Sequence, residues 1–170
     1  MDFAPYIRDI KDFPKPGVVF KDITPLLKNA TALQKAADAL VGFTNNMKID
    51  KVVGIDSRGF IFAPMMAEKL GAGFVTVRKS GKLPYTTISE SYELEYGTGT
   101  LEIHSDAIEV GDKVLVHDDV LATGGTAQAV CRLVEKLGGE VVQCNFLIEL
   151  TFLNGFEKIK DYQKAVLLQY

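Results

Sequence analysis

The chain has 170 residues, of which 47% are hydrophobic and 24% are charged, as in an ordinary globular domain. Its formal net charge of −3 gives no support to a general nucleic-acid binder, which is usually basic. No apolar stretch approaches the roughly eighteen residues that span a bilayer, and the N-terminus lacks the apolar core of a signal peptide. We therefore expect one cytoplasmic domain over residues 1–170, without nucleic acid or a membrane as a partner.

The predicted elements alternate along most of the chain. The first 28 residues contain four of the six prolines and are expected to form an irregular hood rather than part of a sheet. The predicted helices cover 31–47, with Thr31 as the N-cap, 60–70 and 125–137, and the predicted strands cover 51–55, 73–77, 113–116, 140–148 and 165–168. Alternation of this kind predicts an α/β fold with a mainly parallel central sheet flanked by helices. Cys131 and Cys144 fall in these elements and are expected to be buried thiols.

Residues 79–104 interrupt the alternation because they contain no apolar helical pattern. Extended segments are predicted at 85–88 and 98–103, on either side of a polar middle that contains glycine. A segment of this length inside a compact domain is usually a functional lid or a disordered excursion. We expect a mobile lid over 79–104.

Two polar segments, 56–59 and 118–126, each follow a predicted strand. The carboxyl ends of parallel strands meet at one edge of a sheet, and ligands of such folds bind there. We therefore expect these two segments to form one ligand site.

The second of these segments has the composition of an anion-binding loop. Gly124 and Gly125 allow a tight turn with inward-facing amides, and the following helix adds its positive end. The hydroxyls of Thr123 and Thr126 complete a pocket for a phosphate monoester. No lysine follows the glycines, so the loop is not a Walker A motif. A helix N-cap with a glycine-rich turn and no ligand is the alternative interpretation.

Two adjacent carboxylates stand directly before this loop, where they would repel a bare phosphate. They fit a phosphorylated sugar whose hydroxyls need acceptors, with Mg²⁺ nearby to balance the charge. The whole segment resembles the phosphoribosyl pyrophosphate (PRPP) motif of the type I phosphoribosyltransferases. The resemblance implies that family's fold and Mg²⁺ carried by PRPP without a direct protein ligand. It also implies a 5′-phosphate held by Ala122, Thr123, Gly124, Gly125 and Thr126, and ribose hydroxyls bound by Asp118 and Asp119.

Three further regions resemble the adenine phosphoribosyltransferases within that family. They are the hood segment 13–27, the pyrophosphate loop 56–60, and the catalytic loop 78–84 with 92–97. The resemblance extends from about residue 12 to the end of the chain, with the motifs in the family's order. It implies adenine and PRPP as substrates, and AMP and pyrophosphate as products.

In the hood, prolines on either side of Lys15 fix an extended course, so that one peptide edge can offer adenine both a donor and an acceptor. The resemblance implies a main-chain contact at Val19, with Phe20 and Leu150 packing on the base. Lys21 stands where the family often has arginine, so its contact with the base lacks the bidentate guanidinium. The alternative is that Val19 and Phe20 are ordinary core residues.

Pyrophosphate binding is assigned to cations on two segments. Arg58, beside Ser57 at a strand end, can grip phosphate oxygens in pairs. Arg78, Lys79 and Lys82 place three cations within five residues, and a solvated basic turn is the alternative interpretation. In the family, the residue that matches Arg78 can reach the neighbouring subunit's site, which implies a homodimer.

Glu95 is the candidate catalytic acid or base, by resemblance to the family. A proton must move at adenine N7 when N9 attacks the ribose, and a carboxyl group in a dry, closed lid can have the raised pKa that this needs. Glu93 lies on the same face of an extended segment and remains a rival. Tyr85 stands where glycine is common in the family, and His117 is expected to be a structural neighbour of the two acids.

The sequence as a whole predicts transfer of the phosphoribosyl group of PRPP to adenine. One alternative is a transferase for another 6-substituted purine, although main-chain recognition suited to an amino group disfavours an oxo group. The other is a non-catalytic regulator that senses PRPP or nucleotides. Such a regulator needs a nucleic-acid-binding surface, which the sequence does not indicate.

Overall fold

The computed structural model describes residues 1–93 and 98–170, and of Glu93 only the backbone. Its strands are β1 (Arg8–Lys11), β2 (Val19–Asp22), β3 (Lys51–Ile55), β4 (Gly73–Lys79), β5 (Thr87–Glu93), β6 (Thr98–His104), β7 (Lys113–Leu121), β8 (Glu140–Glu149) and β9 (Lys164–Gln169). Its α-helices are α1 (Thr24–Leu27), α2 (Ala30–Gly42), α3 (Gly59–Leu70) and α4 (Gly125–Lys136), and its 3-10 helices are η1 (Ala4–Tyr6), η2 (Thr151–Leu153) and η3 (Gly155–Ile159).

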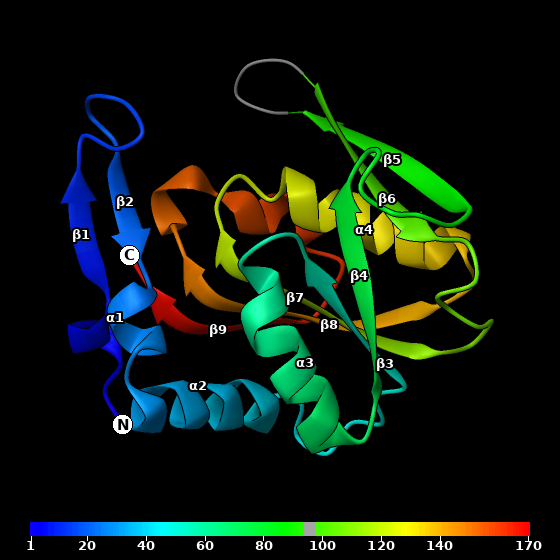
Figure 1. The fold of residues 1–170 in the computed structure, drawn as a ribbon, viewed down its shortest axis with the longest axis horizontal. Coiled ribbons are helices and arrows are strands. Elements are labelled where there is room, and N and C mark those ends of the chain that lie inside the picture. Colours follow the sequence, from blue (N-terminus) through cyan, green and yellow to red (C-terminus); the bar gives the residue numbers. More distant parts are fainter. Residues whose placement is uncertain (94–97) are drawn as a thin grey trace.

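In this described part, seven strands form one sheet in the order β5-β6-β4-β3-β7-β8-β9. The strands from β4 to β9 in that order are parallel, whereas β6 pairs antiparallel with both β4 and β5. Figure 1 shows α2 and α3 on one side of the sheet and α4 on the other. The predicted mainly parallel sheet flanked by helices is therefore confirmed.

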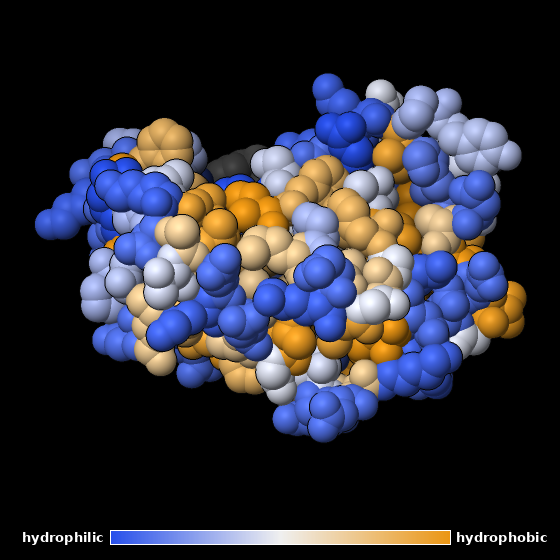
Figure 2. Space-filling model, turned by 60° about the horizontal axis from the view of Figure 1, so that its bottom comes forward, coloured by the Kyte–Doolittle hydropathy of each residue, from blue (hydrophilic) through white to orange (hydrophobic). Residues whose placement is uncertain are grey.

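The core consists of two layers because both faces of the parallel strands are covered. On β7, Val114 and Val116 face the layer under α4, while Leu115 faces the layer under α2 and α3. Successive residues of a strand point to opposite faces, so a continuous apolar run is what a strand covered on both sides requires. Figure 2 turns the side with α2 and α3 forward and shows apolar residues concentrated in its middle. In the described chain, no helix is long and apolar enough to cross a membrane.

β7 is longer than predicted, and the polar loop after it is correspondingly shorter. The strand continues to Leu121 because β8 continues to pair with it, with Asp118 opposite Phe146 and Leu121 opposite Glu149. The ladder hydrogen bonds thus outweigh the low strand propensity of two aspartates. Both acids lie in the end of a strand, and only residues 122–124 separate that strand from α4.

The hood is more regular than the prolines predicted. β1 and β2 form a two-stranded antiparallel sheet, and the prolines at 14 and 16 lie in the connection between them, where no ladder hydrogen bond is lost. The helix α2 also begins earlier than predicted. Asn29, and not Thr31, is its N-cap, because the Asn29 side chain accepts a hydrogen bond from the Ala32 N–H at 2.9 Å.

The predicted lid segment 79–104 forms a β-hairpin where it is described. Thr98–Ile103 is extended as predicted, whereas the preceding strand begins at Thr87 and not at Tyr85. The pair β5–β6 is attached to the rest of the sheet through β6 and β4.

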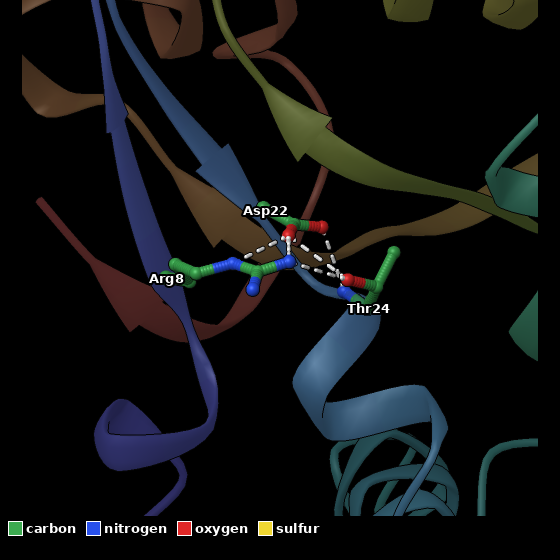
Figure 3. A network of polar contacts seen from close by, with 3 residues as sticks. All are labelled: Arg8, Asp22 and Thr24. Carbon is green, nitrogen blue, oxygen red and sulfur yellow. Dashed lines mark hydrogen bonds and ion pairs between the residues drawn. The ribbon is translucent and has the colours of Figure 1, made fainter.

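Asp22 ties the hood to the rest of the chain at the end of β2 (Figure 3). Its Oδ2 accepts hydrogen bonds from Arg8 Nη2 at 2.6 Å and from the Thr24 hydroxyl at 2.9 Å, and its Oδ1 accepts one from the Thr24 N–H at 2.9 Å. Ile23 and Leu26, on either side of Thr24, are fully buried in the core. A two-stranded sheet by itself is only marginally stable in water. The hydrogen bonds to this buried carboxylate therefore help to hold β2 in position.

We expect the substitution Asp22→Asn to lower the unfolding free energy at neutral pH by about 1–3 kcal/mol, since charged hydrogen bonds are lost. The Thr24 backbone hydrogen bond first, and then Arg8, lower the pKa of Asp22 in the folded state. Its stabilising contribution is therefore complete above the ordinary value of 3.8 and is lost as the pH falls through the lower folded value. Urea unfolding should show a difference between wild type and variant that shrinks below pH 3.8. A difference independent of pH would contradict this; the exposed Asp161→Asn is the control.

Candidate active site

The parallel pairing of β3 with β7 brings the two predicted ligand segments to one edge of the sheet. Gly54 of β3 is in register with His117 of β7, so the residues after each strand end lie next to each other. α3 begins against β7 at Gly59, where a Cβ atom would lie 3.0 Å from the His117 carbonyl oxygen and 3.1 Å from Asp118 Oδ1. Glycine at position 59 therefore allows the close approach of the two segments.

The two segments enclose one cavity of about 230 Å³. It is lined by residues that the sequence assigned separately to pyrophosphate, to ribose and to the 5′-phosphate, namely Ser57, Arg58, Lys79, Asp118, Asp119 and Thr126. A smaller cavity of about 60 Å³ adjoins it and is lined by Asp118, Ala122, Thr123, Gly124 and Thr126. The structure thus brings the predicted phosphate, ribose and pyrophosphate groups together.

The loop before α4 has the geometry of an anion site. Gly124 has φ +79°, in the left-handed region, and it is the N-cap residue of α4. As a glycine it has no side chain to accept a hydrogen bond from the first turn of the helix. The N–H groups of the first turn of a helix have no partner within the helix, and the helix dipole adds positive potential there. The loop and the first turn of α4 can therefore receive a phosphate.

An ion pair connects the two segments across the larger cavity. Arg58 Nε lies 2.8 Å from Asp119 Oδ2, in a contact that is an ion pair without the alignment of a hydrogen bond. Burial, and then the charge of Asp119, raise the pKa of Asp118, whereas for Asp119 burial raises the pKa and Arg58 opposes it. The buried carboxylate of Asp119 and the half-buried carboxylate of Asp118 are thus disfavoured as charged groups and depend on a cation nearby.

The hood reaches this site through Phe20. The Arg58 guanidinium carbon lies 4.9 Å from the centre of the Phe20 ring, a cation–π contact. Val19 is 45% exposed on the same strand, and Leu150 follows the end of β8 and is half-buried. Lys21 points elsewhere, because its Nζ is 2.7 Å from Asp9 Oδ1 and lies over the Tyr170 ring.

The predicted basic cluster is divided. Lys79 lines the larger cavity, while Arg78 Nε is 3.0 Å from Asp56 Oδ2 in the loop after β3. Lys82 is exposed, its carbonyl oxygen accepts a hydrogen bond from Arg78 Nη1 at 3.3 Å, and its N–H donates to the Lys79 carbonyl oxygen at 3.3 Å. The structure therefore does not bring the Lys82 side chain into the cavity.

Glu95, the predicted catalytic residue, lies outside the described residues, and so does the side chain of Glu93. Tyr92, at the end of the described part of β5, lines the larger cavity. The described part of β5 therefore reaches the site at Tyr92.

His117 is fully buried, with its ring edge-on to Phe62 and its Nδ1 3.4 Å from Asn145 Oδ1. Burial lowers the pKa of His117 to about 4, so that the imidazole is neutral at physiological pH. This agrees with the predicted structural role. Cys131 and Cys144 are buried as predicted, with their sulfur atoms 3.5 Å apart.

Sequence reasoning included Asp56 in a predicted loop without giving it a role, and it missed Gly155. Asp56 pairs with Arg78, and Gly155 packs its main chain against the loop 122–124. The dipeptide Asn154-Gly155 is a turn signal that could have drawn attention to the second, although not to its contact.

Known proteins are similar to this chain in sequence and in fold. Residues 22–165 match the family model described as phosphoribosyl transferase domain. An adenine phosphoribosyltransferase of Flavobacterium johnsoniae is 63% identical over 170 residues, which is 100% of both chains. The crystal structure of the adenine phosphoribosyltransferase from Rhodothermus marinus is 56% identical and has a TM-score of 0.95, with 99% of this chain and 96% of that chain covered. The Saccharomyces cerevisiae enzyme, solved with an imino-altritol bisphosphate and adenine, is 40% identical with a TM-score of 0.93, covering 98% and 96%.

These matches define the class of protein as phosphoribosyltransferase. Within that class, the chain belongs to the adenine phosphoribosyltransferases, as its hood, pyrophosphate loop and catalytic loop motifs predicted.

The buried His117 predicts a pH dependence of stability. Because its folded pKa is below the ordinary value of 6.5, only the unfolded chain binds the proton between pH 6.5 and about 4. Its contribution to stability is therefore lost as the pH falls through this range, by on the order of 3 kcal/mol. Unfolding free energies of wild type and His117→Asn, measured by urea titration from pH 7 to pH 4, should show a weaker pH slope for the variant. Equal slopes would contradict this.

Proposed function

We propose that this protein transfers the phosphoribosyl group of PRPP to adenine, and that it does so in the cavity between the loop after β3 and the end of β7. The products are AMP and pyrophosphate, as in the family to which the chain belongs. The observation that carries the proposal is the single cavity of about 230 Å³ that contains both the Asp118–Asp119 pair and Arg58.

The phosphorylated sugar binds along β7 and α4 in this proposal. The 5′-phosphate occupies the loop Ala122–Thr126, supported by the left-handed Gly124 and the free first turn of α4. The carboxylates of Asp118 and Asp119 accept hydrogen bonds from the ribose hydroxyls. Acceptors beside an anion site select a phosphate that carries hydroxyls over a bare phosphate.

The departing pyrophosphate binds to Ser57, Arg58 and Lys79, which line the same cavity. Arg78 and Lys82 add positive charge at its edge in the proposed closed lid. Mg²⁺ would be carried by PRPP without a direct protein ligand, and the negative charges of Asp118 and Asp119 in the cavity lining would help to balance its charge. When bound, the ion would neutralise part of the negative charge of the pyrophosphate.

Adenine binds at the hood, at the main chain of Val19, between Phe20 and Leu150. The S. cerevisiae relative, solved with adenine, supports a base site in this fold. The Arg58 guanidinium lies over Phe20, so it must move aside before a base can stack on that face. The Lys21 side chain forms an ion pair with Asp9 and a cation–π contact with Tyr170. We therefore assign the contact of Lys21 with adenine to its main chain.

The chemical step passes through an oxocarbenium-like ribose as the pyrophosphate leaves and adenine N9 attacks. The enzyme stabilises the separating charges with Arg58 and the carboxylates, and the lid 79–104 excludes water during the step. Glu95 exchanges the proton at N7 when the lid is closed.

We further propose a cytoplasmic homodimer. The residue that matches Arg78 reaches the neighbouring subunit in the family, and Phe74, next to Phe60 at 5.9 Å between ring centres, is 38% exposed. A large apolar ring on the surface is a common component of interfaces.

Purified protein with PRPP and Mg²⁺ should release pyrophosphate with adenine, and far less with hypoxanthine, guanine or xanthine. The expected discrimination is about 10⁴-fold or more, because a main-chain edge that suits an amino group faces like against like with an oxo group. Turnover on another base in preference to adenine would assign the enzyme to that purine. Absence of turnover on all four bases, with PRPP bound, would indicate a sensor.

Replacement of the proposed acid tests the lid. We expect Glu95→Gln to lower kcat about 10²–10⁴-fold with little change in either KM, because the amide cannot exchange the proton. Glu93→Gln is the matched control, two residues away in the sequence, and should retain kcat within about threefold. The reverse result would make Glu93 the catalytic residue.

A further inference from the structure

The turn that follows β8 contacts the proposed phosphate loop through main-chain atoms of Gly155, Ala122 and Gly124. Gly155, at the start of η3, is buried, and a Cβ atom on it would lie 2.0 Å from the Ala122 carbonyl oxygen and 2.9 Å from Gly124 N. A Cβ atom on Gly124 would lie 2.1 Å from the Gly155 carbonyl oxygen. Neither distance leaves space for a methyl group, and the atoms in the way belong to backbone that cannot rotate aside as a side chain can.

The turn is held against the loop from two other directions. The Gln128 amide of α4 donates a hydrogen bond to the Lys158 carbonyl oxygen at 2.9 Å, and Ile159 is buried in the core layer under α4. Asn154 has φ +51°, which turns the chain sharply into η3. Figure 1 shows this turn (orange) beside the beginning of α4. The turn therefore cannot retreat from a side chain at position 155 without losing these contacts.

The contact also fixes the direction of a peptide group in the loop. The virtual Cβ of Gly155 is nearer to the Ala122 carbonyl oxygen, at 2.0 Å, than to its carbonyl carbon, at 2.9 Å, so the carbonyl points at Gly155. In a trans peptide the N–H points opposite to the C=O. The Thr123 N–H is therefore directed away from Gly155, and Ala122, Thr123 and Gly124 all line the small cavity.

We propose that Gly155 is a positioning residue for PRPP binding: it fixes the Ala122–Thr123 peptide so that an amide, and not a carbonyl oxygen, faces the 5′-phosphate. The inference rests on the proposed phosphate site at Ala122–Thr126. The same segment begins with Leu150, whose N–H donates to the Leu121 carbonyl oxygen at 2.9 Å, so it is attached to the end of β7 as well. Gly155 does not touch the substrate and acts through the loop.

The test is the substitution Gly155→Ala, with both Michaelis constants measured. The added methyl group must displace the Ala122 carbonyl, which weakens a hydrogen bond to a charged phosphate. We expect the KM for PRPP and the Kd for ribose 5-phosphate to rise about tenfold or more, while the KM for adenine stays within about twofold. An unchanged KM for PRPP would overturn the proposal. An equal rise in both KM values would also overturn it, because a general loosening of the fold would affect both substrates alike.

Gly139→Ala is the matched control. Its Cβ atom would lie 2.7 Å from Ile108 Cγ2 and 2.9 Å from Val134 Cγ1, so it crowds side-chain atoms, and not backbone, at the opposite end of the strands, before β8. It should lower Tm and leave the KM for PRPP unchanged. If Gly155→Ala does not fold, Gln128→Ala decides instead, since it removes only the hydrogen bond to Lys158. A two- to fivefold rise in the KM for PRPP alone, on the order of one lost neutral hydrogen bond, supports the proposal, and no rise overturns it.

Two further measurements separate this inference from the proposed function. Turnover of the wild type on adenine is measured first, so failure of the proposed function shows in the wild type and not only in variants. Thr126→Val tests the phosphate site itself. An effect of Thr126→Val on the KM for PRPP without any effect of Gly155→Ala overturns the role of Gly155 and leaves the phosphate site in place.

Discussion

The in-register parallel pairing of β3 with β7 is the constraint on which the site depends. It places the loop after one strand beside the end of the other, and Gly59 lets α3 begin within contact distance of Asp118. The result is the ion pair between Arg58 and Asp119, 2.8 Å apart across one cavity. Two adjacent carboxylates removed from water are unfavourable as charged groups, and burial raises the pKa of both Asp118 and Asp119. The Arg58 cation opposes this effect and favours their charged form.

The outer parts of the site are held by contacts that involve no substrate. Asp22 fixes the end of β2 by accepting from Arg8 and Thr24, and Lys21 attaches the same strand to Tyr170 near the C-terminus. On the opposite side, the turn at Gly155 supports the phosphate loop. The proposed base and phosphate subsites are therefore each supported by a segment distant in sequence, which gives a site built on loops a fixed geometry.

Much of this was predictable from the sequence, because apolar runs and glycines carry local information. The span of β3 and the helix that ends at Gly71 follow from patterns of a few residues, as does the left-handed Gly124. The end of β7 could not be predicted in this way, because pairing with β8 extends the strand through polar residues whose sequence resembles a loop. The ion pair of Arg58 with Asp119 and the packing of Gly155 on Ala122 are long-range contacts, and a single sequence does not state which distant residues meet.

The most direct test of the account is a crystal structure of the protein with PRPP and Mg²⁺. The account predicts the 5′-phosphate at the main-chain amides of 122–126 and the pyrophosphate beside Arg58, with ribose hydroxyls on the two aspartates. A more spacious groove of about 500 Å³ lies between the β5–β6 hairpin and α4, with Arg132 and Lys158 in its lining. PRPP bound in that groove, with the Asp119–Arg58 pair unchanged, would contradict the account.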